Sequence, residues 1–227
     1  MEEFFRRLEH QQNLAWGRVH EGAFWAHLRA RGLDRELYVL LMQQVFHYTR
    51  HNSQNQALAA TRLSSDRLRL MRYCLHHSLE EAGHDLMVVS DLKSIGESAE
   101  SVAGSKPLVE TQAFVAYLYR VAAEQDPAAR LGYTHWAEGA SSHIAELITA
   151  MRRDLGLRDN QMTFFVSHAQ LDADHLAEVK QVIADTCTTQ ALQDAVVDVA
   201  VTSLALTGHI MDGALRAYQT VQGGAPA

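Results

Sequence analysis

Proline is almost absent from this chain, and that scarcity constrains the fold more than any other feature of the sequence. It occurs only at Pro107, Pro127 and Pro226, so nearly the whole length is free to form helices. Strands have little support, because alternating β-branched segments bounded by turn residues are missing. Apolar residues recur instead at helical spacing, as Leu41 and Val45 do. The sequence therefore predicts an all-α protein.

Capping residues and glycine stops divide the chain into about seven helices. The first ends before Gly32, with candidate breaks at Gly17 and Gly22, and the second begins after Asp34. The other five are expected over residues 66–95, 107–124, 127–155, 159–186 and 190–221. The predicted architecture is a bundle of helices.

The last of these helices is apolar on nearly every face. Such a helix either lies at the centre of a bundle or is covered by a partner subunit, and a homodimer is the default for a soluble bundle. No segment rich in glycine, proline and serine divides the chain. We therefore expect one domain over residues 1–222, followed by a disordered tail over residues 223–227.

Charge and cysteine content exclude several kinds of partner. Lysine and arginine number 20 against 27 aspartates and glutamates, a net charge of −7, so we expect no nucleic-acid partner. The N-terminal segment is charged and no run of about 18 apolar residues follows it, so we expect no membrane partner. Cys74 and Cys187 are too few for a disulfide framework, which favours free thiols and a cytoplasmic location.

The strongest functional signal lies in the sixth predicted helix. His168, Asp172 and His175 follow one another at spacings of four and three residues, which places them on one face. That face is the apolar one, and burying such groups unpaired costs several kcal/mol. A divalent cation would satisfy all three side chains. The alternative is a core histidine bonded to Asp172, with the second histidine at the edge of a cleft.

Two further clusters supply carboxylates. Glu81 and His84 form a Glu-x-x-His pair on the third predicted helix, a pattern that surface helices also produce by chance. Glu138 in the fifth helix is followed by the small residues 139–142, which would let a ligand or another helix approach the carboxylate. A solvated glutamate beside small packing residues explains Glu138 equally well when it is taken alone.

Together these clusters offer three histidines and three carboxylates. Such a set without thiolates suits iron or manganese, and also zinc, and six side chains exceed what one catalytic ion takes from a protein. We therefore expect two iron ions, with O₂ as co-substrate, a small-molecule substrate and an external electron donor.

Four other polar residues are candidates for a supporting role. Gln44, His47 and Tyr48 share one side of the second helix and could line a substrate pocket, although a core stripe with a satisfied histidine and tyrosine is at least as common. His77 lies one turn before Glu81, and we expect it to support the metal ligands from behind.

The motifs Glu81-x-x-His84 and His168-x3-Asp172-x2-His175, with Glu138 between them, resemble the heme-oxygenase-like di-iron oxidases and oxygenases, also called iron-containing redox enzymes. The resemblance covers essentially the whole chain. It implies the seven-helix fold shared with the TenA-like thiaminases and pyrroloquinoline-quinone synthase, and it assigns these six residues as ligands of two irons.

The same resemblance implies O₂-dependent oxidation of a small acid, amino acid or amine, by N-oxygenation, desaturation, C–C cleavage or oxidative decarboxylation. One departure concerns the first carboxylate, which some members place seven residues before the histidine of the third helix. This chain has His77 there, so Glu81 takes the assignment.

Alternatives stay open at the level of the sequence. A ferritin-like bundle would offer two Glu-x-x-His pairs, whereas this chain has one pair and an imperfect second. A TenA-like thiaminase would need a nucleophilic thiol, and neither Cys74 nor Cys187 stands out as one. A heme oxygenase would need a proximal histidine, such as His20 or His27, and would leave the six-residue cluster unexplained. A cofactor-free enzyme, a non-catalytic module that binds a metal or small ligand, and a purely structural bundle also remain.

Overall fold

The computed structural model describes residues 1–223, except for the side chains of residues 167–173. This part of the chain contains no strand, which confirms the all-α prediction. Its twelve α-helices are α1 Glu2–His20, α2 Ala23–Arg31, α3 Arg35–Thr49, α4 Asn52–Thr61, α5 Leu68–Glu80, α6 His84–Ser94, α7 Ala99–Gly104, α8 Val109–Glu124, α9 Leu131–Glu138, α10 Ala145–Leu155, α11 Thr163–Thr186 and α12 Gln190–Gly223. Four short 3₁₀ turns join them: η1 Ser65–Arg67, η2 Pro127–Arg130, η3 Ala140–Ser142 and η4 Asp159–Gln161. The predicted tail includes residues 224–227, which lie outside the described residues.

The prediction of about seven helices is wrong, because short turns interrupt several of the expected helices. Gly83 between α5 and α6 has a φ of +96°, a left-handed conformation that ends a helix and favours glycine. The first predicted helix breaks at the expected Gly22, while Gly17 stays inside α1. Residues 97–106, which lie between the helices expected over 66–95 and 107–124, contain α7. A periodic pattern continues across a break of two or three residues, so periodicity alone undercounts the helices.

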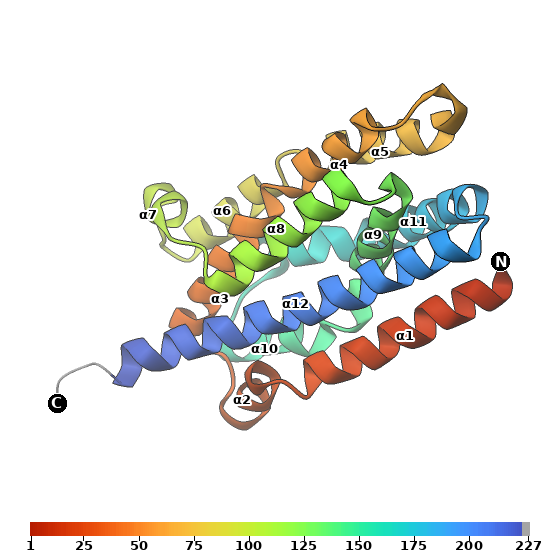
Figure 1. Cartoon of the computed structure of the whole chain (residues 1–227). Coiled ribbons are helices and arrows are strands. Elements are labelled where there is room, and N and C mark those ends of the chain that lie inside the picture. The colour runs from red at the N-terminus through yellow and green to blue at the C-terminus, as the bar shows by residue number, and fades with distance from the viewer. Residues whose placement is uncertain (224–227) are drawn as a thin grey trace.

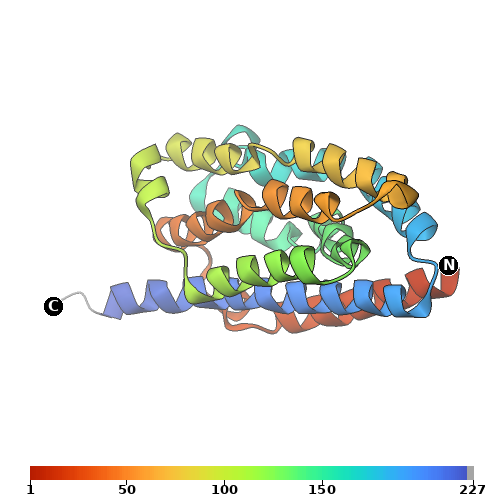
Figure 2. The same ribbon diagram turned by 45° about the horizontal axis from the view of Figure 1, so that its top comes forward.

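Two of these breaks face each other. The helices α3 and α4 follow one another along one line of the bundle, and α5 and α6 return beside them, with α4 packed on α5 and α3 on α6. Figure 2 shows α5 and α6 on one side of the bundle, α12 and α1 on the opposite side, and α3, α4 and α8 between them. The break after α3 therefore lies against the break after α5, in the middle of the molecule.

The helix α12 runs along the bundle and packs against α1, α2, α3, α8 and α9 (Figure 1). By length and composition alone it is also the one helix among the described residues that could cross a membrane. Contacts with five other helices account for its apolar character. Its partner α9 approaches closely at Gly132, where a Cβ atom would lie 2.0 Å from the carbonyl oxygen of Val196. This backbone-to-backbone contact fixes the helix that ends at Glu138.

Candidate metal centre

The two carboxylates of the site both lie at C-terminal ends of helices. Glu81 caps α5 and Glu138 is the last residue of α9. His77 occupies the last turn of α5, four residues before Glu81, so its side chain points the same way. All three are buried, with exposures of 4% for His77, 7% for Glu81 and 5% for Glu138. Their donor atoms lie within 4.8 Å of one another.

Imidazoles contact both carboxylates. His77 Nε2 lies 3.0 Å from Glu138 Oε1, and His175 Nδ1 lies 3.3 Å from Glu138 Oε2. His84 Nδ1 lies 3.3 Å from Glu81 Oε2, and this contact raises the pKa of His84 above its ordinary value, because the hydrogen bond to the carboxylate favours the imidazolium. Five potential ligands from four helix segments thus form one continuous group.

The structure therefore brings together four of the six predicted ligands, namely Glu81, His84, Glu138 and His175. The side chains of His168 and Asp172 lie outside the described residues, so their assignment stays a prediction. The Glu81–His84 pair does not lie on one continuous helix as expected. Its residues lie on either side of the Gly83 turn, and they meet because the turn folds the start of α6 back toward the end of α5.

Asn52 and Arg130, which the sequence analysis did not select, support the carboxylate of Glu81. Asn52 Nδ2 donates to Glu81 Oε2 at 2.6 Å, and Arg130 Nη2 donates to Asn52 Oδ1 at 2.7 Å. Arg130 is 2% exposed, and its guanidinium also donates to the side chains of Asn55 and Thr134. The buried guanidinium of Arg130 is thus linked to the candidate site through the side-chain amide of Asn52. Its signal in the sequence is a lone arginine in the apolar segment that follows Pro127.

Two of the four supporting candidates do not line the cavity beside the site. Gln44 accepts hydrogen bonds from the Leu108 amide and the Thr111 hydroxyl, each at 2.8 Å, and so anchors the start of α8. His47 Nε2 lies 2.8 Å from the Ser105 hydroxyl in the segment before α8, and neither of these two residues lines the cavity beside the site. His77, expected to support the metal ligands, contacts the predicted ligand Glu138 directly. The signal for this position in the sequence was that His77 lies seven residues before His84, where some members of the resembling family carry a carboxylate.

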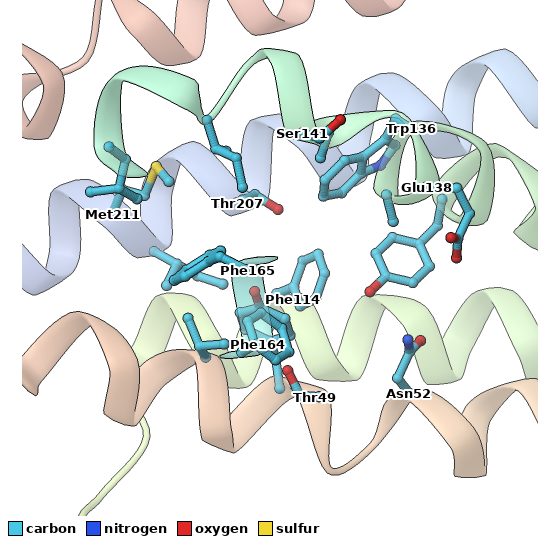
Figure 3. Close-up of a pocket in the computed structure, with 18 of the residues that line it drawn as sticks. Thr49, Asn52, Phe114, Trp136, Glu138, Ser141, Phe164, Phe165, Thr207 and Met211 are labelled. Atoms are coloured by element: carbon cyan, nitrogen blue, oxygen red, sulfur yellow. The ribbon is translucent and has the colours of Figure 1, made fainter. Parts of the chain in front are cut away.

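A cavity of about 140 Å³ lies beside the two glutamates. Figure 3 shows Glu138 and Asn52 at one end, with Phe165 and Met211 toward the other. Tyr48 lines this cavity, as predicted for a pocket residue, and so do Ala140 and Ser141 from the small segment after Glu138. Burial raises the pKa of Tyr48 and Tyr133 above the ordinary value, so both phenols are neutral. The described walls are therefore aromatic and aliphatic, with a few neutral hydroxyls such as that of Thr49, and their charged residues lie at one end.

Both cysteines are free thiols, as predicted, and both are buried. Burial raises the pKa of the Cys74 thiol to about 11 and also raises that of Cys187. A thiol with a raised pKa is a poor nucleophile at neutral pH. The chemistry of a thiol-dependent thiaminase therefore finds no support in these two residues.

Comparisons with known proteins agree on the fold. The model of a family described as iron-containing redox enzymes matches residues 39–208. A structure of a domain of unknown function with a heme oxygenase-like fold, from Shewanella denitrificans, is 37% identical over 97% of this chain and 96% of its own, with a TM-score of 0.92. No curated protein sequence matches.

More distant structures share the fold alone. A TenA homolog from Pseudomonas syringae is 15% identical over 94% of this chain and 93% of its own, with a TM-score of 0.77. A TenA family transcription regulator from a Silicibacter species is 16% identical over 95% and 99% of the two chains, with a TM-score of 0.73.

Proposed function

We propose that this chain, which belongs to the iron-containing redox enzymes, is a di-iron oxidase or oxygenase that uses O₂ to oxidise a small acid, amino acid or amine. The outcome would be N-oxygenation, desaturation, C–C cleavage or oxidative decarboxylation. The observation that carries the proposal is the buried group of His77, Glu81 and Glu138 at the charged end of an apolar cavity.

The residues present fit a metal. A first-row metal ion binds nitrogen and oxygen donors at about 2.1 Å, which leaves the donors about 4 Å apart or less. Ligand atoms of His77, Glu81 and Glu138 already lie within 4.8 Å of one another, so a small closure is enough for the two carboxylates to share an ion. Imidazole and carboxylate donors without a thiolate also suit iron.

The position of the carboxylates supports the same conclusion. The C-terminal end of a helix carries a partial negative charge, so an anion there is destabilised. Glu81 and Glu138 both occupy such ends and are both buried. A bound cation would remove the penalty at both positions, whereas a purely structural bundle gains nothing from this placement.

In the proposed site Glu81, His84, Glu138, His168, Asp172 and His175 would hold the two irons. When bound, the irons would supply the electrons and the open coordination positions for the reduction of O₂. His77 holds Glu138 through its hydrogen bond, and Asn52 holds Glu81. Trp136, Tyr133 and Phe114 form walls that exclude water from the cavity and orient the substrate.

The proposal includes an external electron donor and a homodimer in the cytoplasm, with neither a nucleic acid nor a membrane as partner. The net charge of −7 supports the absence of a nucleic-acid partner, and a homodimer is the default for a soluble bundle.

Anaerobic reconstitution with Fe(II), followed by elemental analysis, tests the proposal. We expect two irons per chain and a transient visible absorption band in stopped-flow mixing with O₂. The Glu81→Gln and His175→Ala variants should each lose at least one iron. Glu80→Gln is the matched control, because this neighbouring carboxylate lies beside His76 on the other side of α5, and it should keep both. Wild-type protein that takes up no iron would refute the proposal.

A further inference from the structure

The shape and chemistry of the cavity narrow the substrate. We propose that the substrate has an apolar body of about six carbon atoms, a single polar group facing Glu81 and Glu138, and no charged group at its far end. This inference rests on the proposed function, because it identifies the substrate with the molecule that fills the cavity beside the candidate metal centre.

The two ends of the cavity differ in character. Glu81, Glu138 and Asn52 line one end. Figure 3 places Met211 and Phe165 toward the opposite end from Glu138, with Phe114 between them. A bound molecule therefore has its polar group at the glutamates and its apolar body among the aromatic rings.

The size of the cavity limits the body. Its volume is about 140 Å³, and an engineered apolar cavity of about 150 Å³ in another protein holds one benzene molecule. A ring or a chain of about six carbons fits this space. A chain twice as long would leave half of its methylenes outside, so those methylenes would add little to its affinity.

At the end of the cavity away from the glutamates, the described walls offer no charged partner. Among the described residues that line the cavity there is no lysine, arginine or histidine. The neutral hydroxyls of Thr207 and Thr49 do line it: that of Thr207 donates to the Ser203 carbonyl at 3.0 Å, and Thr49 Oγ1 is buried without a hydrogen-bond partner. A terminal ammonium or carboxylate would exchange its water here for one or two neutral hydroxyls at most, which do not offset the lost hydration of a charge.

A matched series of six-carbon probes tests the far end. Hexanoate, 6-aminohexanoate and adipate share the chain and one carboxylate, and they differ only in ending as methyl, ammonium or carboxylate. We expect Zn(II)-loaded protein, which is redox-inert, to bind hexanoate at least about 100-fold more tightly than the other two in calorimetry. Dodecanoate should bind no more than about tenfold more tightly than hexanoate, although six fully buried methylenes would give roughly 1000-fold or more. Equal affinities for hexanoate and 6-aminohexanoate would overturn the inference.

A second arm separates this inference from the proposed function. Hexanamide and adipamate, the half-amide of adipate, both carry a neutral amide group, so their binding to metal-free protein does not depend on iron. Metal-free protein should prefer hexanamide by at least about 100-fold. If the protein takes up no iron but keeps this preference, the proposed function fails and the binding site stands. If iron binds and the preference is absent, the inference fails alone.

A substitution in the wall completes the test. Thr207→Leu fills part of the cavity, so hexanamide should bind at least tenfold more weakly. Ala205→Leu makes a similar addition at an exposed position on the same helix and should leave the affinity unchanged. Equal effects of the two substitutions would show that hexanamide binds outside the cavity, which would contradict the inference.

Discussion

Gly132 is the position where a single methyl group should disturb the fold most. Replacement by alanine would place Cβ 2.0 Å from the Val196 carbonyl oxygen and 2.9 Å from the Ala200 amide nitrogen. Non-bonded heavy atoms prefer roughly 3.5 Å, so α9 would have to move away from α12 by about 1.5 Å. Overpacking costs about 1–3 kcal/mol, and more where backbone rather than a flexible side chain must yield. Alanine returns at most about 1 kcal/mol of helix propensity. We therefore expect Gly132→Ala to lower the free energy of unfolding by about 2 kcal/mol or more.

Thermal and urea unfolding of metal-free protein measure this change. For a chain of this size about 1 kcal/mol corresponds to roughly 2–4 °C, so the midpoint should fall by roughly 4–8 °C. Gly17→Ala is the control, because it lies inside α1 and a Cβ atom there has no neighbour within 4 Å. It should be neutral or stabilise the protein by a few tenths of a kcal/mol. If Gly132→Ala unfolds at the wild-type temperature, the close approach of α9 and α12 is refuted.

Four further predictions concern the site and its surroundings. Asn52→Ala removes the amide that bridges a carboxylate and a guanidinium, so the Fe(II) affinity should fall about 10–100-fold in anaerobic titration; an unchanged affinity would contradict the bridging role. His77→Ala should likewise weaken Fe(II) binding at least about tenfold, whereas His76→Ala, on the exposed side of the same helix, should not. Glu138→Gln should stabilise the metal-free protein by about 1 kcal/mol, because it removes a buried charge from a helix C-terminus, and destabilisation in urea would argue against that explanation. Burial lowers the pKa of His135 from 6.5 to about 4, so the unfolded chain takes up a proton that the folded chain excludes. As far as His135 is concerned, the free energy of unfolding then has its full value above pH 6.5, and it falls by roughly 3 kcal/mol or less toward pH 4. His135→Gln should remove most of this slope in urea titrations, and a slope equal to that of the wild type would show that His135 is not its source.

The sequence predicts the helices well where local chemistry marks their ends. Asp34 accepts a hydrogen bond from the Leu37 amide at the start of α3, and Asp126 does the same for Ala128 before α9. The breaks after α3 and within residues 139–144 carry no comparable mark, because no side chain caps the helices that begin after them. Local signals thus identify capped ends but not interruptions that tertiary packing imposes.

The candidate site shows the same division. His77 and Glu81 lie one turn apart on α5, so the helical spacing is enough to predict that they point the same way. Glu138 comes from α9, and only the packing of α9 on its neighbours brings it within 3.0 Å of His77. Arg130 reaches the site through Asn52, across 78 residues of sequence. Contacts of this kind depend on how the helices stack, which the spacing of residues within one helix does not encode.

Helix interruption and helix polarity also explain why the site lies where it does. The turns that end α5 and α9 free the last backbone carbonyls of each helix, and these carbonyls disfavour the anions placed beside them. Glu81 nevertheless meets Asn52 at the start of α4, where the opposing break exposes the N-terminal end of a helix and so offers partial positive charge. Glu138 has His77 and His175 instead. Each carboxylate is thus held in place while its local helix opposes it, so a bound cation would stabilise both. Local sequence preferences are violated at both glutamates, and such violations concentrate at functional sites.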